Sequence, residues 1–178
     1  MKKIMIGISS CLIGENVRYD GGNKRDTYLA DKLSSYVKWV PVCPEVECGL
    51  PVPREPMRLE GDPDSPKIIS IVTNTDKTEL ILAWISKRLE RFEKEEISAF
   101  IFKSRSPSCA LDDAEIFLSD GNTSKTGGIY SKAFVKQFPS IPVIDDSNLK
   151  DDHIRGNFIK RVLGDDIWQQ ICVGSKFR

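Results

Sequence analysis

Three of the five cysteines stand just after stretches that resemble buried strands. Cys11 follows the first apolar run, Cys43 follows the second, and Cys109 lies in the loop after the run that ends at Lys103. Because the carboxyl ends of parallel strands meet at one edge of a sheet, we expect these thiols to converge. Thiolates are soft ligands for zinc and for iron–sulfur clusters. The pattern therefore predicts a metal or cluster site, and the alternative is three unrelated buried thiols.

The spacing of these cysteines favours an iron–sulfur cluster over zinc. Structural zinc usually takes four ligands at short spacing such as Cys-x2-Cys, and the sequence lacks that spacing. Cys43 and Cys48 give only a weak zinc signal, and the single histidine, His153, lies in a polar helical stretch typical of a protein surface. A four-iron cluster on three cysteines keeps one iron open, and an open metal site can act as a Lewis acid.

The elements that must position these residues alternate along the chain. Expected strands cover residues 3–9, 39–42, 67–73, 98–103 and 141–144, and expected helices cover 23–34, 76–96, 127–138 and 149–163, with further turns over 165–172. This alternation predicts an α/β fold, with a parallel, Rossmann-like sheet and helices on both faces. Residues 43–66 are expected as a long loop with room for a short hairpin, and 104–113 as a second loop. We expect one domain over residues 1–178, with a helical C-terminal tail over 145–178.

The overall composition excludes several other classes of protein. Lysine plus arginine and aspartate plus glutamate balance at 26 each, which argues against non-specific nucleic-acid binding. No apolar run approaches the roughly 20 residues of a membrane span, and the apolar N-terminal stretch is too short for a signal peptide. We therefore expect a cytoplasmic protein with no membrane and no DNA partner. In that compartment an odd number of cysteines is not expected to form structural disulfides.

Three short motifs carry a resemblance to a known family. They are Ser-Ser-Cys11-Leu-x-Gly with Arg18-Tyr19-Asp20-Gly21, Cys43-Pro44-Glu45 with Gly49-Leu-Pro-x-Pro-Arg54, and Ser106-Pro107-Ser108-Cys109. Together and in this order, they resemble the signature of the thiouracil desulfidase family, which was long known only as a domain of unknown function. The resemblance covers residues 1–145, and it is specific because all three motifs occur in sequence.

This resemblance implies a [4Fe-4S] cluster held by Cys11, Cys43 and Cys109. The fourth iron would be free to take the sulfur of a thiocarbonyl. The implied reaction converts thiouracil, or a 4-thiouridine nucleoside or nucleotide, to the oxygen compound and releases sulfide. It needs no electron donor, so the implied enzyme is a non-redox desulfidase that cleaves a C–S bond.

The resemblance also implies roles for residues beside the cysteines. The catalytic glutamate of the family matches Glu45, which could act as general base on the attacking water. A catalytic serine maps to Ser106 or Ser108, with Ser106 favoured. The candidates for binding the ring or phosphate of the substrate are Arg18, Tyr19 and Arg54. The alternative interpretation is that these three residues form salt bridges within their own loops.

Two residues depart from the family pattern, and other functions stay open. Ala110 stands where the family usually has glycine, and Cys48 could close the open iron as a fourth ligand. Relatives that act on tRNA carry an additional domain, so the length of this chain favours a small free substrate. The alternative function is a zinc- or cluster-stabilised nucleotide-binding module without turnover. A redox-active thiol protein is disfavoured because Cys-x-x-Cys is missing, and a homodimer formed through the tail is left open.

Overall fold

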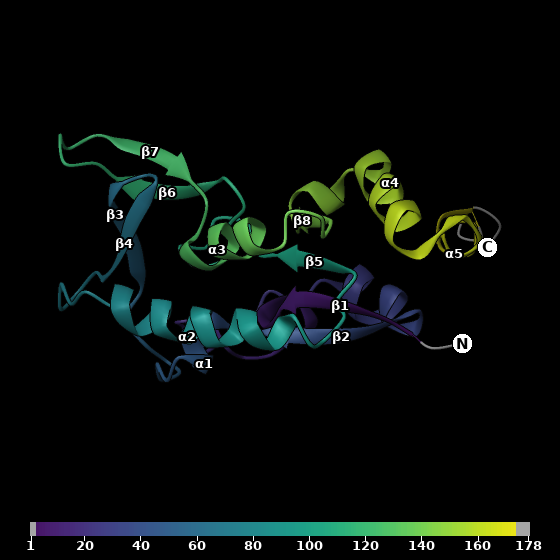
Figure 1. The fold of residues 1–178 in the computed structure, drawn as a ribbon, viewed down its shortest axis with the longest axis horizontal. Helices are drawn as coiled ribbons and strands as arrows, with labels where there is room; N and C mark the ends of the chain where they lie inside the picture. The colour runs from purple at the N-terminus through teal and green to yellow at the C-terminus, as the bar shows by residue number, and fades with distance from the viewer. Residues whose placement is uncertain (1–2, 174–178) are drawn as a thin grey trace.

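The structure is a computed structural model that describes residues 3–173. Of the domain expected over residues 1–178, residues 1–2 and 174–178 lie outside the described part. The described strands form two four-stranded sheets, here called sheet A and sheet B. Figure 1 shows sheet B at one end of the molecule and the C-terminal helices at the other, with sheet A between them.

Sheet A confirms the expected α/β fold with a parallel sheet. Its strands are β1 (Ile4–Ser9), β2 (Val37–Val42), β5 (Ala99–Phe102) and β8 (Val143–Asp145). They lie in the order β2-β1-β5-β8, and each neighbouring pair is parallel. Ile6 of β1 pairs with Trp39 of β2 on one side and with Ala99 of β5 on the other.

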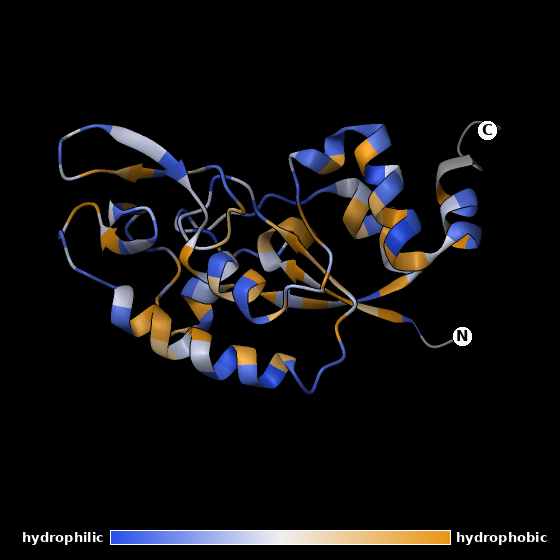
Figure 2. Cartoon of the chain, turned by 45° about the horizontal axis from the view of Figure 1, so that its top comes forward, coloured by the Kyte–Doolittle hydropathy of each residue, from blue (hydrophilic) through white to orange (hydrophobic). Residues whose placement is uncertain are grey.

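The central strands of sheet A separate two hydrophobic cores. Along β5, Phe100 and Phe102 belong to one core, whereas Ala99 and Ile101 belong to the other. This division follows from the period of two in a strand, which sends successive side chains to opposite faces. All four residues are fully buried, and the central strands are coloured mostly hydrophobic in Figure 2. Both faces of the sheet are therefore covered, as a parallel sheet requires.

Helices cover these two faces. The described helices are α1 (Pro44–Glu47), α2 (Thr78–Phe92), α3 (Ile129–Gln137), α4 (Asp152–Leu163) and α5 (Asp165–Trp168). Short turns lie at η1 (Ser10–Ile13), η2 (Tyr28–Lys32), η3 (Leu33–Ser35), η4 (Asn148–Lys150) and η5 (Gln169–Val173). Ile81, Ile85 and Phe92 of α2 join the core of Phe100, and α4 joins the other core through Phe158.

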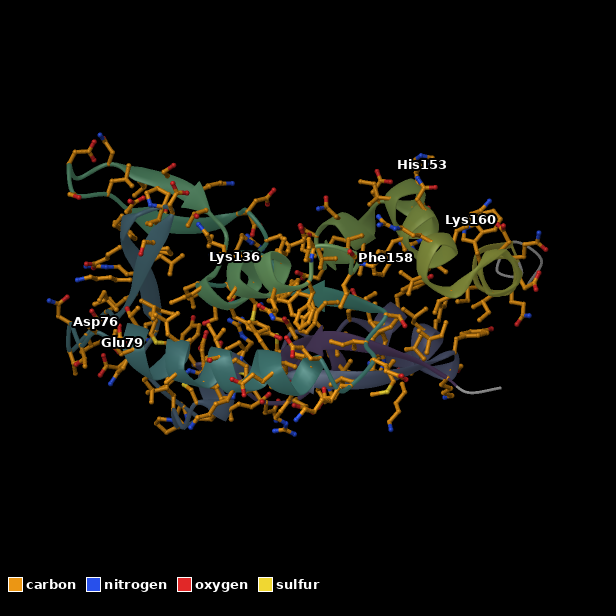
Figure 3. The ribbon with its side chains drawn as sticks, viewed as in Figure 1. Asp76, Glu79, Lys136, His153, Phe158 and Lys160 are labelled. Atoms are coloured by element: carbon orange, nitrogen blue, oxygen red, sulfur yellow. The ribbon has the colours of Figure 1, made fainter. Side chains whose placement is uncertain are left out.

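The polar face of α4 lies at the surface. His153 and Lys160 extend away from the helix while Phe158 points toward the strands (Figure 3). His153 is exposed, as predicted, and its ring lies 3.2 Å from the side-chain amide of Asn157. No described helix has the length and apolar character needed to cross a membrane.

The helix expected over residues 23–34 is wrong in its first part. Helical structure begins only at Tyr28, as the π-helical turn η2. The backbone N–H groups of Lys24 and Asp26 instead donate to the carbonyl oxygens of Cys11 and Leu12. These bonds hold residues 24–26 against the loop after β1, so the chain cannot coil there.

Sheet B was not expected as a separate sheet. It consists of β3 (Met57–Asp62), β4 (Ser65–Ser70), β6 (Ala114–Phe117) and β7 (Thr123–Thr126), in the order β4-β3-β6-β7. The β3–β4 and β6–β7 pairs are antiparallel hairpins, and β3 and β6 pair in parallel. The long loop expected over residues 43–66 therefore holds α1 and β3, and its hairpin extends into β4.

Candidate active site

The loops after β1, β2 and β5 enclose a cavity of about 460 Å³ at the carboxyl edge of sheet A. Cys11 lies in η1 directly after β1, Cys43 precedes α1 after β2, and Cys109 lies in the loop after β5. All three cysteines line this cavity. The structure thus brings together the three thiols that the sequence placed on separate loops.

Burial keeps these thiols from ionising by themselves. It raises the pKa of Cys11 to about 11, although the positive charges of Lys103 and Arg18 oppose this effect. It raises the pKa of Cys43 to about 12 and that of Cys109 well above its ordinary value. Negative charge on Cys43 or Cys11 further raises the pKa of Cys109, so the three sulfurs interact electrostatically. A bound metal centre is the group that stabilises thiolates in such a site.

The donor set of three cysteines around one cavity fits a four-iron cluster. Within residues 3–173, no three His, Cys, Asp or Glu side chains gather closely enough to hold one metal ion. A four-iron cluster is broader, because each cysteine binds a different iron, and its ligands stand further apart. Three thiols around a cavity of this size therefore fit such a cluster.

Glu45 is held at the cavity by hydrogen bonds to both of its carboxylate oxygens. Pro44 begins α1, which is favourable because the first helical position needs no N–H donor. Glu45 follows at the second position, with its side chain lining the cavity. Ser108 Oγ donates to Oε1 at 2.8 Å, and Arg54 donates to Oε2 through Nε at 2.9 Å and Nη2 at 2.5 Å.

The two candidate serines have different surroundings. Ser106 lines the cavity, and its Oγ accepts hydrogen bonds from the backbone N–H groups of Ser108 and Cys109 at 3.3 and 3.1 Å. Its hydroxyl donates no hydrogen bond to any of the described residues. Ser108 is fully buried, and its hydrogen is engaged with Glu45. The surroundings favour Ser106 as the serine that meets a ligand, although its catalytic role stays a prediction.

The three residues predicted to bind substrate all line the cavity. Tyr19 is 42% exposed, and the guanidinium of Arg18 lies 5.4 Å from the centre of its ring. Arg18 also lies 3.4 Å from the carboxylate of Asp20. Arg54, by contrast, is engaged with Glu45 and with backbone carbonyls. Substrate binding by these three residues stays a prediction.

Sequence reasoning missed three further cationic residues that line the cavity. Lys103 directly follows β5 and forms an ion pair with Asp146 at 2.8 Å. Lys24 and Arg105 also face the cavity, and Arg105 adopts a positive φ of 58°. Such a backbone is uncommon for a residue other than glycine and tends to occur at functional sites. The signal available in the sequence was the place of Lys103 directly after a buried strand.

The N-terminus of α3 is occupied by the loop that carries Cys109. The backbone N–H groups of Ile129 and Tyr130 donate to the carbonyl oxygens of Pro107 and Ser108 at 3.1 and 2.9 Å. A Cβ atom added to Gly128 would lie 2.4 Å from the carbonyl carbon of Ser108. The helix start therefore anchors this loop, and glycine is needed at the point of closest approach.

The two departures from the family pattern leave the cavity intact. Cys48 is not among the residues that line the cavity, and its thiol donates to the carbonyl oxygen of Glu45 at 3.2 Å. Ala110 is fully buried, and its backbone has no positive φ that would demand glycine. Neither residue is among those that line the cavity with the three cysteines.

Comparison with known proteins gives consistent matches. Residues 6–146 match the family model for 2-thiouracil desulfurase. The uncharacterized protein YbbK of Bacillus subtilis (strain 168) is 33% identical over 156 residues, which cover 83% of this chain and 99% of that protein. A solved structure described as the [4Fe-4S]-dependent thiouracil desulfidase TudS superposes with a TM-score of 0.63 at 27% identity, covering 84% of this chain and 94% of that one.

Proposed function

Because the chain belongs to the 2-thiouracil desulfurase family, we propose that it is a [4Fe-4S]-dependent, non-redox desulfidase. Its substrate is a thiolated uracil base, nucleoside or nucleotide of the 4-thiouracil or 4-thiouridine type, which it converts to the oxo form with release of sulfide. The observation that carries this proposal is the meeting of Cys11, Cys43, Cys109 and Glu45 at one cavity. The structural likeness to a thiouracil desulfidase supports it.

The cluster would be held by Cys11, Cys43 and Cys109. Three protein ligands would leave one iron without a cysteine, and the cluster would thereby supply a Lewis acid for the thiocarbonyl sulfur. The overall change exchanges the C=S bond for C=O with one water, so no electrons are gained or lost.

Glu45 acts on the attacking water. A carboxylate has about four lone-pair sites, and the hydrogen bonds from Ser108 and Arg54 leave room on Glu45 to accept a proton from water. These two partners hold the carboxylate in one orientation, which a general base needs. Removal of the proton creates the nucleophile that forms the new C–O bond.

Ser106 donates its hydroxyl proton to the ring nitrogen beside the reacting carbon and recovers a proton from the new C–OH group as the C=O bond forms. The proton held by Glu45 leaves with the sulfide. The oxygen of Ser106 already accepts two backbone N–H groups, from Ser108 and Cys109. Donors placed in this way stabilise negative charge on an oxygen that gives up its proton. Ser108 contributes by holding Glu45.

The charge of the cavity favours an anionic substrate, so a nucleotide is the preferred candidate. Its lining includes five basic side chains, which are Arg18, Lys24, Arg54, Lys103 and Arg105. Glu45 is the one carboxylate among the described lining residues. Lys24 and Arg105 form no ion pair within the described part of the chain and can contact a phosphate. The half-exposed ring of Tyr19 offers a surface on which a base can stack.

The proposal is tested by purifying the protein without oxygen and measuring iron, sulfide and the broad visible absorbance of an iron–sulfur cluster. Sulfide release is then followed with 4-thiouracil and 4-thiouridine monophosphate. C11A is expected to lose the cluster, E45A to keep the cluster and lose turnover, and C48A to keep both. A colourless protein that binds nucleotides without releasing sulfide would favour the binding-module alternative instead. A cytoplasmic location and a homodimer stay predictions.

A further inference from the structure

Arg54 makes hydrogen bonds to several separate segments of the chain. Its Nε and Nη2 donate to Oε2 of Glu45 at 2.9 and 2.5 Å. Nη2 also donates to the carbonyl oxygen of Val17 at 2.9 Å, and Nη1 donates to that of Pro51 at 3.3 Å. The backbone N–H of Arg54 donates to the carbonyl oxygen of Tyr19 at 2.8 Å.

These bonds join two loops that carry cysteines of the site. Val17 belongs to the loop after Cys11. Glu45 lies two residues after Cys43, in the segment that follows β2. The same two loops touch where Cys43 Sγ lies 3.9 Å from the carbonyl oxygen of Val17. One guanidinium therefore fixes the loops to each other as well as the carboxylate between them.

The guanidinium has little capacity left for a ligand. Of its five N–H donors, the two on Nη2, the one on Nε and one on Nη1 are directed at protein oxygens. The side chain is only 6% exposed. Binding a phosphate would require Arg54 to give up bonds to Glu45 or Val17. The side chains of Arg105 and Lys24, which line the same cavity, form no ion pair with any of the described residues.

We propose that Arg54 is a positioning residue that orients Glu45 and ties the Cys11 loop to the Cys43 loop, and that it does not bind the substrate. This inference rests on the proposed function in one respect, because it takes Glu45 as the base of that reaction. The joining of the two loops is independent of the reaction.

Lysine cannot replace arginine in this role. The planar guanidinium presents several donors in a fixed fork, whereas an ammonium is a single point on a flexible stem. A lysine at position 54 keeps the positive charge but cannot reach Glu45, Val17 and Pro51 together. R54K therefore tests the hydrogen-bond geometry of Arg54 while the positive charge is kept.

Steady-state kinetics of the cluster-containing enzyme distinguish positioning from substrate binding. For R54K we expect kcat to fall by about ten- to a hundredfold, because small displacements of a catalytic group have effects of this size. KM for 4-thiouridine monophosphate stays within about twofold. In an E45Q background, R54K costs little further activity, because the two residues act as a unit. The control is R58K, since Arg58 forms an ion pair with Glu60 on sheet B, away from the cavity, in more exposed surroundings than the pair of Arg54 with Glu45.

Amide hydrogen exchange of the same purified proteins tests the loop contact without any turnover. R54K is expected to exchange about tenfold faster than wild type over residues 11–25 and 43–48, while R58K is unchanged there. If wild type releases no sulfide, the proposed function fails and the exchange measurement alone decides this inference. A rise in KM with kcat preserved, or unchanged exchange in both segments, overturns the role of Arg54 while the desulfidase function stands.

Discussion

Replacing Gly128 by alanine tests how the Cys109 loop is held. Its backbone angles, φ −66° and ψ 156°, are ones that alanine adopts without strain. In open space such a replacement stabilises a protein by about 0.4–1 kcal/mol through the unfolded chain. Here the added Cβ would lie 2.4 Å from the carbonyl carbon of Ser108 and 2.6 Å from the backbone nitrogen of Cys109. These atoms belong to a backbone that cannot rotate away.

The steric contact decides whether G128A raises or lowers the free energy of unfolding. Overpacking a well-filled site costs about 1–3 kcal/mol, which exceeds the gain from the unfolded chain. Relief of the contact requires the loop to move away from α3, and Cys109 moves with it. We therefore expect G128A to lower the free energy of unfolding and to reduce the iron content per chain.

The assay compares G128A with G156A. Gly156 lies inside α4, where an added Cβ meets only the side-chain nitrogen of Trp168 at 3.1 Å. Urea unfolding and iron content of anaerobically purified protein are measured for both variants, and G156A is expected to resemble wild type. If G128A were as stable as wild type with full iron content, the account of the α3 anchor would be refuted.

Three further predictions concern the surroundings of the cavity. Burial opposes ionisation of Asp146, but hydrogen bonds from Lys103 and Ser104 outweigh it and lower its pKa. A lowered carboxyl pKa contributes stability that is present above its unfolded value and is lost as pH falls through the folded value. Wild type should therefore lose more unfolding free energy than D146N during acid titration, and parallel curves would contradict this. C48S is expected to retain the visible absorbance of the cluster, whereas loss of that absorbance would make Cys48 a ligand. The buried hydroxyl of Tyr130 has no hydrogen-bond partner among the described residues, so Y130F should equal or exceed wild type in urea unfolding by up to about 1 kcal/mol, and a large loss would reveal a partner for the hydroxyl.

Much of sheet A could be predicted from the sequence because its central strands, β1 and β5, are largely buried on both faces. The run from Ala99 to Phe102 is apolar throughout, which is typical of a parallel strand between two layers. Sheet B gave a weaker signal. In β3 the buried Leu59 stands between Arg58 and Glu60, and β7 consists of polar residues. Such strands are specified by their hairpin partners more than by their own composition.

The positions of the cysteines in the site followed from the strand ends, but the roles of their neighbours did not. Ser106 and Ser108 are two residues apart, and only the folded loop shows that one faces the cavity while the other is buried against Glu45. Arginine is a residue type that often binds phosphate, yet the contacts of Arg54 are made to segments that are distant in sequence. Tertiary hydrogen bonds of this kind leave no local pattern to recognise.

The order of strands in sheet A has a consequence for the size of what the cavity can hold. Cys43, Cys11 and Cys109 follow β2, β1 and β5, which are adjacent strands in that order. Adjacent strands lie about 4.8 Å apart. The strand spacing therefore sets the distances between the points at which the three loops begin. A strand inserted between β1 and β5 would move the start of the Cys109 loop away from the other two loops by about one strand spacing. Relatives that conserve the motifs but differ in strand order should therefore be unable to bind the same cluster with these three cysteines.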